Sequence, residues 1–276
     1  MIQYDMFDLK GKTALITGGC GLLGVKHAEA ILEFGGEVIL ADIVSKEEQE
    51  KVIINLKQKY DDPIWKPKIS FVYMDVTDKS SIQKAVDKYN KIDVLINNAG
   101  LDPKVENGLE WKNNFEHLEL DSWNKTIDVT LTGTFLCSQV VINKMLSTGL
   151  ESKYCRDGGV ILNIASDLAI ISPDQRIYSG GVKPASYGVA KAGVVNLTKY
   201  LSTYLAKKNI RVNSLSPAGV YNNQSDEFVS KFKNLIPMDR MARPNEYKGA
   251  VVFMCSDASS FMTGHNLVID GGRTIW

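Results

Sequence analysis

The sequence predicts an α/β fold in which helices cover both faces of one parallel sheet. Short apolar runs rich in β-branched residues alternate with longer stretches of helical character along the whole chain. Most of these runs are almost continuously hydrophobic, which is typical of strands buried on both faces. Such alternation requires parallel pairing through right-handed crossovers. We therefore expect a doubly wound, Rossmann-type three-layer sandwich with a seven-stranded parallel sheet.

The individual elements follow from this alternation. Strands are expected over 13–17, 37–42, 69–75, 92–98, 159–166, 210–217 and 265–270. Helices are expected over 22–35, 45–60, 78–90, 121–146 and 186–209. Ser45 is the expected N-cap of the second helix, because its hydroxyl can accept a hydrogen bond from a free backbone N–H.

No linker, repeat or low-complexity tract divides the chain, so we expect one domain over 1–276. Three loops, at about 101–120, 168–184 and 220–244, are expected to form the substrate pocket. In an open α/β sheet, ligands bind outside the carboxyl ends of the strands, and the first two loops leave strands at that edge.

Composition excludes several other classes of protein. Lys and Arg total 32 and Asp and Glu total 32, so the formal net charge is zero and no basic surface for nucleic acid is expected. No run is long and apolar enough to span a membrane, and the first residues lack a signal-peptide core. The four cysteines show no metal-ligand or disulfide spacing. These observations predict a cytoplasmic protein without a metal site.

A glycine loop follows the first strand. Gly19, Gly21 and Gly24 form G-x-G-x-x-G between a strand and a helix, where glycines let backbone N–H groups approach a pyrophosphate. Alone, the pattern also suits a tight turn. Asp42 ends the second strand about 20 residues later, where an acid can bind the adenosine ribose hydroxyls. No Arg follows it, only Ile43 and Val44, so NAD is favoured over NADP.

A tyrosine and a lysine could carry the chemistry. Tyr187 and Lys191 lie four residues apart at the start of an expected helix, hence on one face. A nearby ammonium favours phenolate and makes the pair an acid and base for an alcohol oxygen. Lys153 and Lys183 are placed on the surface. Tyr178 lacks a lysine four residues later and is assigned to the pocket or the surface.

Several motifs together give the chain a clear resemblance, over nearly its whole length, to the short-chain dehydrogenase/reductase family. They are TGGCGLLG at 17–24, DVTD at 75–78, NNAG at 97–100, NIAS at 163–166, YGVAK at 187–191, RVNSLSPAG at 211–219, SSFMTG at 259–264 and VIDGG at 268–272. The resemblance implies hydride transfer between NAD(H) and a secondary alcohol or ketone.

The resemblance also implies roles for residues. Tyr187 is the catalytic acid/base, Lys191 lowers its pKa and binds the nicotinamide ribose, and Ser166 polarises the substrate oxygen. The cofactor-binding residues it implies are Gly18, Gly19, Gly21, Leu22, Leu23, Gly24, Asp42, Ile43, Asp75, Val76, Asn98, Ala99, Gly100, Tyr187, Lys191, Pro217, Gly219, Val220 and Asn222.

Two positions depart from the family pattern. The glycine spacing is that of the extended members, with Leu22 where compact members have glycine, but too little chain follows Tyr187 for a further domain. We therefore expect a compact member with an altered loop. Thr130 stands where the family has an Asn that kinks a helix and holds a water of the proton relay. A tolerated substitution is the favoured interpretation, and slower turnover is the alternative.

The substrate is expected to be polar. The candidate substrate residues are Asp102, Asp167, Tyr178 and Tyr221, and they suit a polyol or sugar-like molecule better than a steroid or acyl chain. A weaker resemblance to bacterial oxidoreductases of surface-sugar pathways, including those for legionaminic acid, points the same way. The alternatives are a 3-ketoacyl-acyl-carrier-protein-type ketoreductase and a non-catalytic NAD-binding protein. By analogy with the family, a homodimer or homotetramer is expected through helices 121–146 and 187–207.

Overall fold

The computed structural model describes residues 6–60, 68–103, 114–149, 158–178 and 181–276, and within them seven strands form one parallel sheet. The strand order is β3-β2-β1-β4-β5-β6-β7. The strands are β1 (Thr13–Thr17), β2 (Glu37–Asp42), β3 (Ile69–Tyr73), β4 (Val94–Asn97), β5 (Gly159–Ile164), β6 (Ile210–Pro217) and β7 (Asn266–Ile269). The predicted seven-stranded parallel sheet is confirmed.

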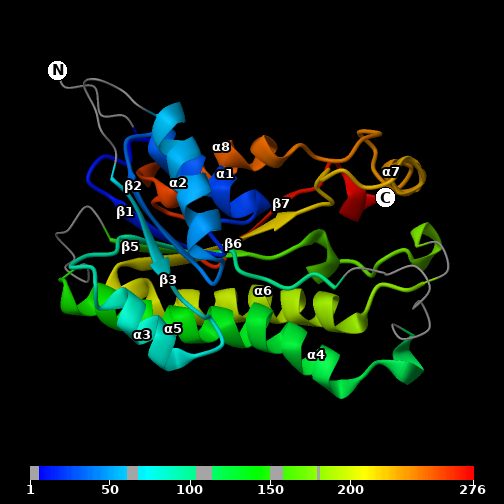
Figure 1. Cartoon of the computed structure of the whole chain (residues 1–276), viewed down its shortest axis with the longest axis horizontal. Coiled ribbons are helices and arrows are strands. Elements are labelled where there is room, and N and C mark those ends of the chain that lie inside the picture. Colours follow the sequence, from blue (N-terminus) through cyan, green and yellow to red (C-terminus); the bar gives the residue numbers. More distant parts are fainter. Residues whose placement is uncertain (1–5, 61–67, 104–113, 150–157, 179–180) are drawn as a thin grey trace.

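Helices cover both faces of this sheet (Figure 1). One layer holds α1 (Leu22–Glu33), α2 (Lys46–Lys59) and α8 (Lys248–Cys255). The other holds α3 (Lys79–Val86), α4 (Leu120–Ile127), α5 (Gly133–Ser147) and α6 (Ala185–Leu205). The short helix α7 (Asp226–Lys233) lies near the C-terminus, at one end of the molecule. No helix among the described residues has the length and apolarity needed to cross a membrane.

Strand β1 shows why the strand sequences are almost continuously apolar. Ala14 and Ile16 belong to the buried cluster that includes residues of α1 and α8. Leu15, between them, belongs to the cluster that includes residues of α5 and α6. Successive side chains of a strand point to opposite faces, so a sheet covered on both sides buries every residue.

The helix expected over 121–146 is interrupted. A π-helical segment, Asp128–Thr132, separates α4 from α5, and Thr130 lies at its centre. π-Helical turns inside α-helices are rare and often occur at functional sites. The hydrophobic pattern continues through the interruption, so periodicity alone does not show it.

The strand order reverses between β1 and β4, because β2 follows β1 on one side and β4 pairs with β1 on the other. The two strand ends are held together by side-chain hydrogen bonds. Asn98 Nδ2 donates to the carbonyl oxygens of Thr17 and Gly18, each at 3.0 Å. Thr17 Oγ1 accepts from the N–H groups of Asn98 and Ala99. A doubly wound sheet binds ligands in the crevice at this reversal.

Candidate active site

The glycine loop is closely packed backbone. Gly18 has a φ of +60°, a conformation that favours glycine. A Cβ at Gly19 would lie 3.0 Å from Leu40 Cα, and a Cβ at Gly24 would overlap the carbonyl oxygen of Gly18. Helix α1 begins directly after Gly21, and no side chain caps its first N–H groups. The start of α1 therefore presents backbone N–H groups without a side-chain cap and the positive end of a helix dipole, as a pyrophosphate site requires.

Asp42 contacts this loop. Its Oδ2 accepts from the N–H of Cys20 at 3.0 Å, and its Oδ1 accepts from the N–H of Ile43 at 2.8 Å. The carboxylate thus orders the loop from the end of the neighbouring strand. Asp75 lies just beyond β3, and its Oδ1 accepts from the N–H and the hydroxyl of Thr77.

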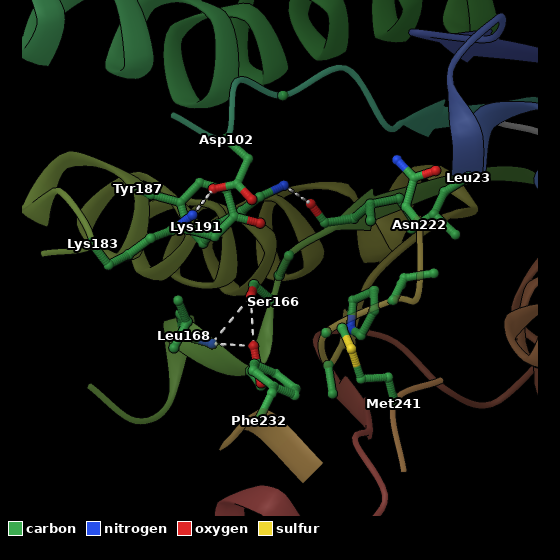
Figure 2. A pocket seen from close by; sticks show the side chains of 18 of the residues that line it. Leu23, Asp102, Ser166, Leu168, Lys183, Tyr187, Lys191, Asn222, Phe232 and Met241 are labelled. Carbon is green, nitrogen blue, oxygen red and sulfur yellow. Dashed lines mark hydrogen bonds and ion pairs between the residues drawn. The ribbon is translucent and has the colours of Figure 1, made fainter. Parts of the chain in front are cut away.

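A cavity of about 360 Å³ opens beside these strand ends. Figure 2 shows side chains from several elements around it, with Asp102, Lys183, Tyr187 and Lys191 close together. The predicted site residues that line it are Leu22, Leu23, Asn98, Gly100, Asp102, Ser166, Asp167, Tyr178, Tyr187, Lys191, Pro217, Gly219, Val220 and Asn222.

Other predicted residues are not among the lining. The cofactor candidates outside it are Gly18, Gly19, Gly21, Gly24, Asp42, Ile43, Asp75, Val76 and Ala99. Tyr221, a substrate candidate, is also outside it and is 46% exposed. The substrate loop expected over 101–120 falls partly outside the described residues, as does Lys153.

Tyr187, Ser166 and Lys191 converge in this cavity. Tyr187 and Lys191 come from successive turns of α6, and Ser166 follows β5. Burial raises the pKa of Tyr187, Asp102 adds to the increase, and a hydrogen bond with Ser166 acts in the opposite direction. Burial lowers the pKa of Lys191 to about 8, while its Nζ donates to the carbonyl oxygen of Ile164 at 2.6 Å. The site therefore disfavours an isolated charge on either group.

Buried amides fix α6 against the sheet below these residues. Asn97 on β4 donates to Asn163 Oδ1 on β5 at 2.8 Å and to Ser138 Oγ on α5 at 3.0 Å. Asn163 in turn donates to Thr198 Oγ1 on α6 at 2.8 Å. Buried polar groups are costly unless they are paired, so this chain of bonds restricts how α6 can sit on β4 and β5.

Thr130 contacts the loop after β4. Its Oγ1 accepts from the N–H of Leu101 at 3.0 Å, and Thr134 Oγ1 donates to its carbonyl oxygen at 2.8 Å. A Cβ at Gly100 would lie 3.3 Å from Lys191 Nζ and 3.7 Å from Thr130 Oγ1. The Thr130 hydroxyl and the Lys191 ammonium therefore both lie close to the backbone of Gly100.

Lys183 is not on the surface, so that expectation is wrong. Its side chain is only 9% exposed, and its Nζ forms an ion pair with Asp102, whose side chain is 59% exposed. The same Nζ lies 4.9 Å from the centre of the Tyr187 ring, and Lys191 Nζ lies 5.8 Å from it. Tyr187 thus has a lysine ammonium on either side.

Sequence reasoning missed two charged residues of the cavity. Lys183 carried a local signal, because it precedes Tyr187 by the same four positions by which Lys191 follows it. It was overlooked since it lies in a loop before the helix begins. Arg273, which also lines the cavity, carried no local signal, because its partner Asp167 lies 106 residues earlier in the sequence.

The residues present fit a dinucleotide. The glycines leave no space for side chains where backbone must approach a ligand, and the capless N-terminus of α1 faces the same strand ends as Asp42. The loop continues to the cavity through Leu22 and Leu23, which line it. A turn that fits a phosphate and a cluster of titratable side chains therefore lie at one edge of the sheet.

Comparison with known proteins gives consistent results. The family model described as enoyl-(acyl carrier protein) reductase matches residues 22–274. A trans-4-hydroxycyclohexanecarboxylate dehydrogenase of Sinomonas cyclohexanicum is 33% identical over 95% of this chain and 93% of its own length. An NAD-dependent glycerol dehydrogenase of Listeria innocua is 32% identical over 98% of this chain and 96% of its own length.

A solved short-chain dehydrogenase of Leptospira borgpetersenii with bound NAD+ has the same fold. It is 32% identical, with a TM-score of 0.81, over 100% of this chain and 98% of that chain. Sequence, sheet topology and relatives agree, and the chain belongs to the short-chain dehydrogenase/reductase family, whose members are oxidoreductases.

Proposed function

We propose that this protein is an NAD-dependent oxidoreductase that interconverts a secondary alcohol and a ketone on a polar, polyol or sugar-like substrate. The observation that carries the proposal is the Lys183–Asp102 ion pair beside Tyr187. An ammonium that donates and a carboxylate that accepts can bind neighbouring hydroxyl groups of one molecule. A simple alkyl chain would displace water from this pair without replacing the water's hydrogen bonds, at a cost in free energy.

In this proposal Tyr187 exchanges a proton with the reacting oxygen, and Ser166 donates a hydrogen bond to the same oxygen. Burial disfavours the Tyr187 phenolate and the Lys191 ammonium when either is charged alone. Because their charges are opposite, the ammonium of Lys191 stabilises the phenolate of Tyr187. NAD(H), when bound, supplies or accepts the hydride. Gly18 to Gly24 would hold the pyrophosphate, and Asp42 the adenosine ribose.

Asp42 and its neighbours support NAD rather than NADP. A carboxylate at this strand end repels a 2′-phosphate, and the next side chain, Ile43, is exposed and uncharged. The relative from Listeria innocua is named as NAD-dependent, in agreement with this proposal.

Asp102, Asp167 and Tyr178 remain proposed substrate residues, since all three line the cavity. Tyr221 is a weaker candidate because it lies outside the lining. We also retain as proposals a single domain over 1–276 and a homo-oligomer through α5 and α6, where Phe135, Tyr200 and Tyr204 are exposed.

The alternative ketoreductase function has support among the relatives. A 3-oxoacyl-[acyl-carrier-protein] reductase of Aquifex aeolicus is 31% identical over 96% of this chain. The charged pair beside Tyr187 favours the polyol over a β-ketoacyl group. The presence of Ser166, Tyr187 and Lys191 in one cavity argues against the third candidate, a non-catalytic NAD-binding protein.

The test compares matched substrates. Wild-type protein is assayed with NAD and with NADP on glycerol, threitol and mannitol, and on propylene glycol against isopropanol, which lacks the neighbouring hydroxyl. We expect Lys183→Met to lower kcat/KM about 10–100-fold for propylene glycol and less than about 3-fold for isopropanol. Lys199→Met, an exposed position on α6, is the control. No turnover of any polyol, with ready reduction of β-ketoacyl thioesters, would reject the proposal in favour of the ketoreductase.

A further inference from the structure

A buried ion pair joins two distant parts of the chain next to Ser166. Asp167, which follows Ser166 directly, pairs through Oδ2 with Nη1 of Arg273. Asp167 is 2% exposed and Arg273 is 5% exposed. Such a pair is costly to bury and contributes to stability only where both groups are well partnered. Its position in the cavity raises the question of what it does there.

The local backbone fixes Arg273 where it reaches Asp167. Gly271 and Gly272 adopt positive φ values of +67° and +92°, and the turn Arg273–Ile275 follows them. The Asp270 carboxylate accepts from the N–H groups of Gly272 at 2.8 Å and Thr274 at 2.7 Å. The guanidinium lies 4.7 Å from the centre of the Phe232 ring on α7. The arginine is therefore held from several sides.

The other carboxylate oxygen controls Ser166. Ser166 Oγ donates to Asp167 Oδ1 at 2.8 Å, and the N–H of Leu168 donates to the same oxygen at 2.8 Å and to Ser166 Oγ at 3.1 Å. Figure 2 shows the bond from Leu168 to Ser166. The Ser166 hydroxyl thus donates to a carboxylate. A free carboxylate would hold this proton firmly, and an ion-paired one accepts it less strongly.

We propose that Arg273 is a positioning residue for the catalytic cluster: by pairing with Asp167 it orients the Ser166 hydroxyl and offsets a negative charge close to Tyr187. The inference rests on the proposed roles of Ser166 and Tyr187. It does not depend on which alcohol the protein uses.

The charge balance around Tyr187 sets the expected effect. The charged or titratable groups that face it are Lys191 on its own helix, Lys183 before that helix, Asp102 after β4, Asp167 after β5 and Tyr178 in the loop between β5 and α6. Asp167 acts to raise the pKa of Tyr187. Loss of Arg273 leaves that charge without its counter-ion, so Tyr187 should ionise at higher pH.

The experiment measures pH profiles of kcat and kcat/KM for alcohol oxidation in Arg273→Met, Arg273→Lys, Asp167→Asn and the double variant. For Arg273→Met we expect kcat to fall about 10–100-fold and the alkaline rise of activity to move up by about one pH unit. Arg273→Lys should restore part of both. Asp167→Asn should move the alkaline rise of activity to lower pH. Adding Arg273→Met to Asp167→Asn should change the pH of that rise little.

A spectroscopic titration makes the result independent of turnover. The ionisation of Tyr187 is followed by the ultraviolet absorbance of its phenolate, taken as the difference between proteins with and without Tyr187→Phe. In Arg273→Met, the midpoint of this titration should move to higher pH. If only the melting temperature falls while the pH profile and the titration stay unchanged, Arg273 is merely structural and the inference is wrong. Should Arg273→Met fail to fold, unchanged profiles in Arg273→Lys, Asp167→Asn and the double variant would equally reject it. Absence of any alcohol oxidation by wild type rejects the proposed function instead.

Discussion

The two sides of the crevice differ in the groups that line them: backbone groups on one side and charged side chains on the other. On the proposed cofactor side, around β1 and β2, the surface is formed by the backbone of the glycine loop and the start of α1. The carboxylate of Asp42 orders this loop. On the proposed substrate side, charged side chains from separate loops meet in pairs, Lys183 with Asp102 and Arg273 with Asp167. Backbone sites need small residues at fixed local spacing, whereas side-chain sites need partners that only folding brings together.

The largest expected effect tests whether the two halves can be separated. Tyr187→Phe should lower kcat by about 10³-fold or more, because the phenol O–H that exchanges the proton is lost. NAD binding, measured by fluorescence titration, should change less than about 3-fold, since the glycine loop is untouched. Tyr73→Phe, an exposed tyrosine at the end of β3, is the control and should retain full activity. Retained activity in Tyr187→Phe would refute the assigned role.

The converse substitution acts on the backbone half. Gly24→Ala places a methyl group against the Gly18 carbonyl and should lower the free energy of unfolding by about 2–4 kcal/mol. NAD binding should weaken at least about 100-fold, because the loop must move. Gly249→Ala on α8 has open space around its Cβ position and should be neutral or stabilising by about 0.5–1 kcal/mol. Equal NAD affinity in both variants would show that the loop is not the cofactor site.

A smaller effect sharpens the role of Asp42. Asp42→Asn removes the charge and keeps an oxygen that can accept from the N–H of Cys20. The kcat/KM with NAD should fall about 10–100-fold, and the ratio of kcat/KM with NADP to kcat/KM with NAD should rise. Asp42→Ala removes both and should in addition lower the melting temperature by a few degrees, as calorimetry would detect. An unchanged cofactor ratio in both variants would contradict the NAD proposal.

The smallest effect concerns how the buried Lys191 changes the free energy of unfolding with pH, measured without added cofactor. The pKa of Lys191 is lowered to about 8, so below that pH the fold carries a buried charge. The unfolded chain binds more protons between about pH 8 and pH 10.5, and stability should therefore rise with pH across this window. Lys191→Met should be more stable than wild type by about 1–3 kcal/mol at pH 7, with the gain shrinking toward pH 10. Denaturant titration at both pH values measures it, with Lys199→Met as control.

Sequence predicted the sheet and the close packing of the glycine turn well, for physical reasons. A strand buried on both faces favours apolar residues at successive positions, as at Ala14, Leu15 and Ile16. Gly18 has a positive φ and Gly24 has no room for a side chain, so both positions require glycine and can be recognised in the sequence. The capping box at Ser45 also formed, with Glu48 as its partner.

The rest depended on contacts between distant residues. Lys183 is polar and lies in a loop, which is typical of the surface, but contacts with Asp102, the Pro103 carbonyl and the Tyr187 ring bury its side chain. Arg273 has no nearby sequence feature that points to Asp167. The π-helical turn around Thr130 is also invisible in the hydrophobic pattern, because it shifts the helix without changing which residues are apolar.

In the proposed function, the Asp42 carboxylate that selects the cofactor is also the group that orders the loop through the N–H of Cys20. The residue that would be exchanged to admit a phosphorylated dinucleotide is also the one that keeps the first turn after β1 in shape. An engineer who swaps it for a small neutral side chain thus alters discrimination and rigidity at once. Supplying a replacement acceptor for that single N–H would be the first requirement of any redesign.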